Sequence, residues 1–233
     1  MSKVMLIGMT TPSAYTGCKT ANELVAYTAR VSNPGNQNNT ETAPKLLSYL
    51  IKNQHWSPFE MVSLTMEITT TRDISRQILR HRSFSFQEFS QRYAEATYFT
   101  GREARLQDPK NRQNSIELDL EDHGKGGEGQ FSNSTSRLAE EWHIKQREVI
   151  NKSRQVYEWA LNNGIAKEQA RAVLPEGNTE TVLYMAGTLR SWIHYCDLRR
   201  GHGTQKEHMV VADQCWDIIR YHFPDVAEAV DGR

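Results

Sequence analysis

The sequence predicts an α+β protein with a central mixed or antiparallel sheet flanked by helices. Helix-like segments, with apolar residues three or four apart, alternate with a few strand-like segments that are not neighbours in the chain. No internal repeat and no clear linker divides the 233 residues, a length that a single domain commonly has. We therefore expect residues 1–233 to form one domain, with a surface insertion at about 107–135.

The first half of the chain contains two strand-like and three helix-like segments. Alternating apolar and polar residues favour strands, and apolar residues at helical spacing favour helices. In chain order, we expect a strand at 4–7, a helix at 19–31, a helix after the N-cap Thr40, a strand at 61–69 and a helix at 72–81. Beyond Arg82, the phenylalanines favour extended chain.

The second half begins with a segment unlike the rest of the chain. Residues 107–135 are rich in turn-forming and charged residues and have few apolar ones, which favours a mobile surface insertion. The elements expected after it are a long helix at 134–163, a short helix at 166–173, a strand at 179–188 and helices at 189–198 and 205–221.

The overall composition excludes several classes of protein. There are 28 Lys and Arg against 28 Asp and Glu, whereas a protein that wraps a polynucleotide normally has a basic excess. No apolar run approaches the roughly 18 residues of a membrane span, and residues 1–8 lack a leader's cleavage signal. The three cysteines have neither metal nor redox spacing. We expect a cytoplasmic protein (in the host cytoplasm if the source is a virus) without nucleic-acid or membrane partners.

The cations are unevenly distributed along the chain. Seven of the 18 arginines lie between Arg72 and Arg105, in a stretch that contains no lysine. The planar guanidinium of arginine can hold a phosphate or a carboxylate through two parallel N–H donors. A solvated helix face or a set of structural ion pairs explains such a cluster equally well, so the residues between the arginines decide the interpretation.

The segment 80–92 carries groups that suit a nucleotide ligand. It starts with an Arg-His-Arg run at 80–82. If the following chain is extended, Glu88, Ser90 and Arg92 project to one side, because side chains alternate along a strand. A carboxylate, a hydroxyl and a guanidinium then face one pocket, as a ligand with a phosphate and polar hydroxyls requires.

These residues resemble the signature of the flavin-dependent thymidylate synthases. The matching positions are Arg80, His81, Arg82, Ser85, Glu88, Ser90 and Arg92. Other segments are also similar to this family, namely His55–Glu60, Ala170–Pro175, Leu189–Arg199 and Gln205–Glu207. Two features depart from the pattern: residues 107–135 have no clear counterpart, and Gln87 stands where Asn is commoner. Neither departure removes a charged group.

The resemblance implies the flavin-dependent thymidylate synthase fold and a reaction. Members of the family convert deoxyuridine monophosphate (dUMP) to thymidine monophosphate (dTMP). They take the carbon from methylenetetrahydrofolate and reducing equivalents from NADPH through bound FAD, without an enzyme cysteine nucleophile. They are homotetramers with sites where subunits meet.

The resemblance also implies a role for individual residues. The FAD would be held by Ser57, Arg80, His81, Arg82, Glu88, Thr188, Arg190 and His194. The dUMP would be surrounded by Gln77, Arg80, Glu88, Ser90, Arg92, Arg171 and Arg199. The catalytic residue would be Arg199, because a cation beside the uracil ring favours its ionised form.

Helix geometry adds a hypothesis about the segment 189–199. Arg190 and His194 are four residues apart and share a face, whereas Arg199 lies about 140° around an ideal helix from His194. One helix would therefore serve the flavin on one side and the nucleotide on the other.

Other residues invite alternative chemistry. Ser90 has no nearby histidine in the sequence that could activate it as a nucleophile, and Cys196 lies on an apolar helix face, as structural cysteines do. His202 and His208 lack a carboxylate at ligand spacing, so no metal site is expected. Trp56 could stack on the flavin or fill the core. A dinucleotide-binding glycine motif is absent, which excludes a Rossmann domain.

Two other classes of function stay open from the residues alone. The arginine-rich segment could contact the backbone of RNA or DNA, although the zero net charge and the interleaved acids disfavour it. A nucleotide-binding regulatory oligomer without activity is the other alternative.

Overall fold

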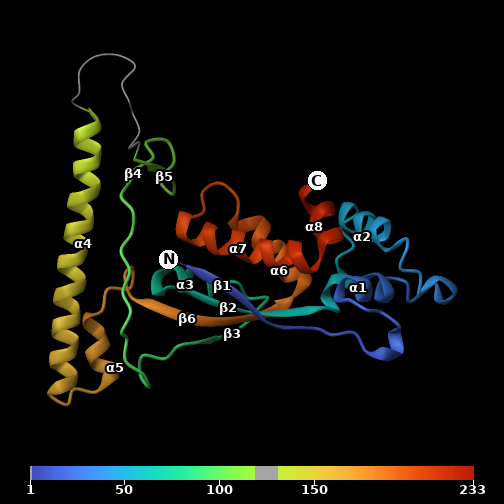
Figure 1. The fold of residues 1–233 in the computed structure, drawn as a ribbon, viewed down its shortest axis with the longest axis horizontal. Helices are drawn as coiled ribbons and strands as arrows, with labels where there is room; N and C mark the ends of the chain where they lie inside the picture. The colour runs from blue at the N-terminus through green and yellow to red at the C-terminus, as the bar shows by residue number, and fades with distance from the viewer. Residues whose placement is uncertain (1, 119–130) are drawn as a thin grey trace.

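A four-stranded antiparallel sheet forms the centre of the structure, in the order β1-β2-β6-β3 (Figure 1). The computed structural model describes residues 2–118 and 131–233. The sheet strands are β1 (Lys3–Met9), β2 (Ser63–Thr71), β3 (Ser85–Glu88) and β6 (Glu180–Thr188). Every pairing within this sheet is antiparallel, which confirms the antiparallel form of the predicted α+β class.

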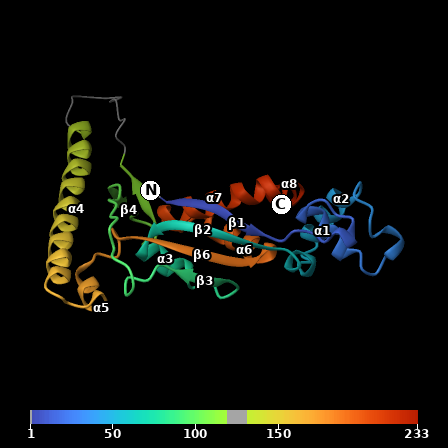
Figure 2. The ribbon, with the colours of Figure 1, turned by 60° about the horizontal axis from the view of Figure 1, so that its bottom comes forward.

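The helices lie on one face of this sheet and beyond its two ends (Figures 1 and 2). Their bounds are α1 (Ala21–Ala29), α2 (Ala43–Lys52), α3 (Arg72–Ile78), α4 (Phe131–Asn162), α5 (Lys167–Ala170), α6 (Leu189–Arg199), α7 (Lys206–His222) and α8 (Pro224–Asp231). Helices α6 and α7 cover the sheet, while α1, α2 and α8 pack together at one end. The long helix α4 stands with α5 at the opposite end.

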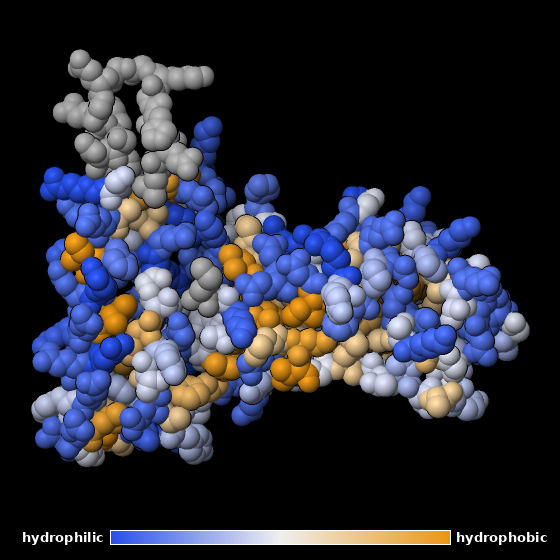
Figure 3. Space-filling view, viewed as in Figure 1, coloured by the Kyte–Doolittle hydropathy of each residue, from blue (hydrophilic) through white to orange (hydrophobic). Residues whose placement is uncertain are grey.

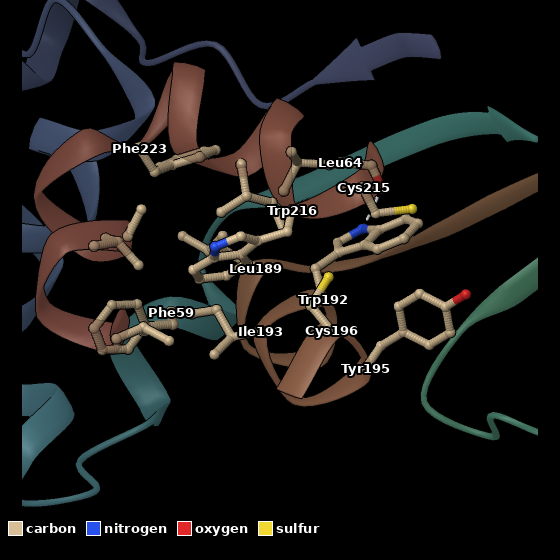
Figure 4. Packing of buried hydrophobic residues seen from close by; sticks show 14 of the residues in the cluster. Phe59, Leu64, Leu189, Trp192, Ile193, Tyr195, Cys196, Cys215, Trp216 and Phe223 are labelled. Carbon is tan, nitrogen blue, oxygen red and sulfur yellow. Dashed lines mark hydrogen bonds between the residues drawn. The ribbon is translucent and has the colours of Figure 1, made fainter. Parts of the chain in front are cut away.

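The alternating pattern of β2 explains why one face of the sheet is covered. Val62, Leu64, Met66 and Ile68 are at most 1% exposed, and they pack against the aromatic residues of α6 and α7 (Figure 4). The opposite face stays open, with Met5 and Ile7 of β1 and Tyr184 of β6 exposed there (Figure 3 shows apolar side chains on the surface of the body and along α4). The sheet of a single chain therefore buries only one of its faces.

A close approach of Gly187 to Phe84 fixes the chain just before β3. A Cβ atom on Gly187 would lie 2.4 Å from the Phe84 ring, so a larger residue there would displace the ring. Phe84 is in turn packed edge-on against Trp192 of α6, with ring centroids 4.8 Å apart (Figure 4 labels Trp192). This contact anchors the segment that carries Arg80, His81 and Arg82.

The start of α2 differs from the prediction. The N-cap is Thr42, two residues after the expected Thr40, and a proline follows in the first turn, where it is well tolerated. The Thr42 hydroxyl accepts a hydrogen bond from Arg30 at 2.8 Å instead of capping the helix. The Thr40 prediction is wrong because proline, together with this distant arginine, sets the helix start.

Several further elements were not predicted from the sequence. The 3₁₀ helix η3 (Ser57–Glu60) precedes β2, and α8 follows α7 after Pro224, burying Val226 and Val230 against α2. Within the predicted insertion, β4 (Arg105–Gln107) and β5 (Ser115–Glu117) form a hairpin whose side chains are largely exposed. The rest of the insertion prediction, over 119–130, lies outside the described residues.

The other predicted elements are confirmed within two or three residues of their expected ends. The long helix ends before Gly164, which adopts φ +77° as a helix-terminating glycine does. None of the helices in the described parts of the chain combines the length and apolar character that crossing a membrane demands.

Candidate active site

The end of α3 and the loop after it bring the Arg-His-Arg run to the last turn of α6. The Nε–H of Arg199 donates a hydrogen bond to Nε2 of His81 at 2.9 Å. Arg80 and Arg82 are exposed and make no ion pair with any carboxylate in residues 2–118 or 131–233. Two free guanidinium groups therefore flank a histidine that is joined to the predicted catalytic arginine.

His81 is held in its neutral form. Burial, together with the positive charges of Arg199 and Arg80, lowers the pKa of His81 from 6.5 to about 4. Because Nε2 accepts the bond from Arg199, the proton of the neutral ring lies on Nδ1. Burial lowers the pKa of Arg199, yet an arginine stays charged at neutral pH. The pair is thus a neutral acceptor that orients a cation.

The other predicted flavin residues lie around the first turns of α6. Thr188 caps the helix, accepting a bond from the Ser191 N–H. Arg190 makes an ion pair with Glu60 of η3, the element that also carries the exposed Ser57.

The two sides of α6 contact different parts of the chain. The His194 ring lies edge-on to Trp56, with centroids 4.7 Å apart, whereas Arg199 turns to His81. His194 and Arg199 thus lie on different sides of α6, as their spacing predicted, and the use of these sides by flavin and nucleotide stays a prediction. Trp56 packs against the main core, which supports the core-filling alternative for this residue.

Glu88, at the end of β3, is engaged within its own chain. Its carboxylate accepts hydrogen bonds from the hydroxyls of Ser75 at 2.8 Å and Thr181 at 3.1 Å. Arg72 and Arg76 of α3 lie 3.7 Å and 3.4 Å from the same carboxylate. Any ligand contact of Glu88 would therefore be made by a side chain that is already fixed in position.

The expected alternation of Glu88, Ser90 and Arg92 is wrong beyond Glu88. The Ser90 carbonyl accepts bonds from the N–H groups of Tyr93 and Ala94, both at 3.1 Å, which turns the chain. The Ser90 hydroxyl also accepts from the Arg92 N–H at 3.4 Å, as serine commonly does in turns. The turn ends the extended segment before Ser90.

Arg92 and Arg171 form a second group, near α5. Arg92 lies 3.4 Å from the Glu168 carboxylate, and Arg171 donates to the Glu168 carbonyl at 3.3 Å. None of the hydrogen bonds or ion pairs between described residues joins this group to His81 or Arg199. A single chain therefore separates the predicted nucleotide-binding residues into two groups.

Structural ion pairs account for five arginines of the cluster. Carboxylates pair with Arg72, Arg76, Arg92, Arg102 and Arg105. The clearest case is Arg102, whose guanidinium lies 2.6 Å from Asp73 and 3.0 Å from Glu207. The alternative of structural ion pairs therefore holds for these five arginines. The partner of Arg102 and Arg105 could not be named from the sequence, because Glu207 is about a hundred residues away in the chain. Among the described residues, Arg80 and Arg82 are thus the arginines of the cluster that have no carboxylate partner.

Two of the three cysteines, Cys196 and Cys215, are inaccessible in the fold. Cys196 and Cys215 are fully buried beside Trp192 and Trp216 (Figure 4). Burial raises the pKa of both thiols well above its ordinary value, so they are uncharged thiols at neutral pH. The prediction that Cys196 is structural agrees with this placement.

The buried His208 and the half-buried His81 predict a specific acid sensitivity. Burial, with Arg199, His81 and Arg80 nearby, lowers the pKa of His208 from 6.5 to about 3, and that of His81 falls to about 4. Both are neutral in the folded chain but take up protons when unfolded below pH 6.5. The free energy of unfolding should therefore decrease as the pH falls from about 6.5 towards 4.

Denaturant titrations between pH 7 and pH 4.5 measure this dependence. A His208→Asn variant has one titrating ring fewer, so its stability should decline less steeply over that range. An equal decline in both proteins would contradict the neutral state of His208.

Comparison with known proteins agrees with this fold. The model of the family described as thymidylate synthase complementing protein matches residues 14–225. The chain is 46% identical over 227 residues to the probable flavin-dependent thymidylate synthase of Paramecium bursaria Chlorella virus 1, covering 97% of each. It is 51% identical over 208 residues to the flavin-dependent thymidylate synthase of Synechocystis sp., covering 89% of this chain and 88% of that protein.

A solved structure has the same architecture. The UMP/dUMP methylase PolB from Streptomyces cacaoi, bound with 5-Br dUMP, is similar with a TM-score of 0.79 and 25% identity, covering 100% of this chain and 95% of the other. Fold and relatives together define an enzyme built on a single α+β domain. The chain belongs to the family of flavin-dependent thymidylate synthases, as the resemblance of its Arg-His-Arg segment predicted.

Proposed function

We propose that the protein uses FAD to methylate dUMP to dTMP reductively, with methylenetetrahydrofolate as carbon donor and NADPH as reductant. One observation carries this proposal: two arginines that have no ion-pair partner among the described residues flank a neutral histidine that orients Arg199. The relatives are named flavin-dependent thymidylate synthases, and the methylase with the same architecture was solved with a dUMP analogue.

The residues of the chain fit a dinucleotide such as FAD. Arg80 and Arg82 have exposed guanidinium groups, whose paired N–H donors suit the two phosphates of a pyrophosphate. Ser57, Thr188, Arg190 and His194 offer polar groups along the first half of α6. Burial and the charge of Arg190 lower the pKa of His194, which favours a neutral ring there. The flavin, once bound, would supply the reducing equivalents for the methyl group.

Arg199 is proposed as the catalytic residue that activates the uracil ring. Its Nε–H is held by His81, so within the described chain its terminal amino groups keep their donors for a ligand. A guanidinium beside N3 stabilises the deprotonated ring electrostatically, which needs no covalent attack. The buried state of Cys196 supports a reaction without a cysteine nucleophile.

The dUMP site is proposed to form between chains of a homotetramer. In the described part of one chain, no hydrogen bond or ion pair joins the group around Arg199 to the group around Arg92, and both groups are proposed to contact nucleotide. Three surface clefts of about 400, 660 and 540 Å³ lie around residues 100–107, and none of the three is lined by a predicted ligand-binding residue. A second chain would therefore supply the missing wall.

Exposed apolar side chains offer surfaces for this assembly. The open face of the sheet carries Met5 and Ile7, and α4 carries Trp142, Val149 and Trp159, which are 44–59% exposed (Figure 3). Burying such residues between subunits would be favourable. We further propose that the enzyme acts in the cytoplasm, of a host cell if the source is a virus, and that residues 107–135 are a surface insertion.

Spectroscopy and isotope release test the proposal together. The purified protein should show the yellow flavin spectrum, directly or after reconstitution with FAD, and bleach when NADPH is added. With methylenetetrahydrofolate present, it should release tritium from 5-tritiated dUMP. A colourless protein that does not take up FAD would overturn the proposed function.

A further inference from the structure

His208 of α7 is a buried histidine whose two ring nitrogens both have partners. The side chain is 0% exposed. Its Nε2 lies 3.1 Å from the Tyr195 hydroxyl of α6, which Figure 4 shows pointing away from the labelled apolar residues. Its Nδ1 lies 3.2 Å from Oε1 of Gln77, a residue proposed to contact dUMP. The ring thus joins the apolar core to the proposed nucleotide site.

The direction of these hydrogen bonds is set by Glu207, which is connected to His208 through Gln205 and Gln77. The Glu207 carboxylate is paired with Arg102 and Arg105. Although burial raises its pKa, a backbone N–H, Arg105, Arg102 and Gln205 together lower it below the ordinary value. Glu207 is therefore ionised and can only accept hydrogen bonds.

An ionised Glu207 orients the two amides that follow. Gln205 donates its Nε2–H to Glu207 at 2.9 Å, which leaves the Gln205 oxygen facing Gln77. Gln77 donates its own Nε2–H to that oxygen at 2.8 Å and turns its oxygen to His208. Because this oxygen accepts, Nδ1 of His208 carries the proton, and Nε2 accepts from the Tyr195 hydroxyl.

We propose that His208 and Tyr195 are positioning residues that lock the Gln77 amide with an N–H facing the dUMP site. The inference rests on the proposed function, and it deepens it by adding the group that orients a substrate contact. One Nε2–H of Gln77 is used by Gln205, and the second is left for an acceptor-only group of the nucleotide, a phosphate or carbonyl oxygen. If the Gln77 amide were reversed, a lone pair of its Oε1 would face the nucleotide oxygen, and the two would repel each other.

Substitutions of His208 separate positioning from packing. His208→Leu fills the space but removes the donor to Gln77, and we expect the KM for dUMP to rise about ten-fold or more while flavin content and kcat change little. His208→Asn keeps an N–H near the position of Nδ1 and should restore the KM towards the wild-type value. Val211→Ala, a buried truncation one turn further along α7, should lower the melting temperature without raising the KM.

Each result decides between the alternatives. An unchanged KM in His208→Leu overturns the positioning proposal, provided that the wild type methylates dUMP. If Val211→Ala raises the KM as much as His208→Leu does, the proposal is also overturned, because a general loss of packing would then explain the effect. If the wild type does not use dUMP at all, the proposed function fails instead.

An NMR measurement tests the proposal without any activity. The ¹⁵N chemical shifts of the His208 ring report which nitrogen carries the proton. We expect the proton on Nδ1 in the wild-type protein. A ring protonated on Nε2 reverses the chain of hydrogen bonds and overturns the proposal, whatever the enzyme assay gives.

Discussion

Replacing Arg199 with alanine is expected to remove most of the methylation of dUMP while the fold and the bound flavin persist. Arg199 is the last residue of α6 and is only half-buried. Removing its side chain therefore leaves no cavity among apolar residues. What disappears is the cation proposed to stabilise the ionised uracil ring. Loss of one such preorganised group typically lowers kcat by about a hundredfold to a thousandfold. Tritium release from 5-tritiated dUMP measures the effect, and the flavin spectrum reports cofactor content.

A matched control comes from the next residue. Arg200 has the same side chain but turns away from His81, to Asp213 at 3.0 Å and to the ring of Trp216. Arg200→Ala should therefore lower stability slightly and leave the rate of tritium release nearly unchanged. If Arg199→Ala turns over dUMP as fast as Arg200→Ala does, the electrostatic role assigned to Arg199 is wrong.

Replacing Glu88 with alanine should give the largest loss of stability. The Arg72 guanidinium is about nine-tenths buried and lies 3.7 Å from Glu88, so the change leaves a buried charge without this partner. Removing one partner of a buried pair commonly costs about 3–5 kcal/mol, and two hydroxyls also lose their acceptor. Urea unfolding of the protein without added ligands measures the loss.

The control for this change is Glu176, another carboxylate that pairs with an arginine of α3. Glu176 lies 3.8 Å from Arg76, in a pair in which both side chains are about half exposed. Glu176→Ala should change the free energy of unfolding by less than about 1 kcal/mol, as exposed pairs do. A similarly small effect of Glu88→Ala would show that Glu88 serves ligands alone and does not hold the subunit together.

Local patterns predicted the elements that carry the site. The alternation of apolar and polar residues in β2 and the spacing of side chains along α6 are patterns of residues close in the sequence. The sequence alone was therefore enough to place Arg199 and Arg190 on opposite sides of one helix. The turn at Ser90 could not be predicted in this way, because the choice between strand and turn depends on side-chain bonds that compete with the sheet.

Contacts between distant segments were the features that sequence reasoning could not supply. Glu207 pairs with Arg102 and Arg105 from about a hundred residues away, so neither of these two arginines is free for a ligand. His208 was considered only as a metal ligand, since nothing in the local sequence shows that it meets Tyr195 and Gln77. A helical pattern with a polar residue on a buried face is the one signal that could have identified it.

The residues proposed to bind nucleotide fall into two groups within one chain. Arg199 and His81 lie at the end of α6, whereas Arg92 and Arg171 lie beside Glu168 near α5. If the first group of one chain and the second group of another form each dUMP site, neither Arg199→Ala nor Arg92→Ala homotetramers should be active. A mixed tetramer, however, would contain some sites in which both groups are intact.

Mixing the two inactive variants shows whether each dUMP site is shared between chains. Arg199→Ala and Arg92→Ala proteins, co-expressed with different tags and purified through both, should regain a clear fraction of the wild-type rate of tritium release. Mixed tetramers that bind flavin but stay as inactive as either parent would contradict a site shared between chains.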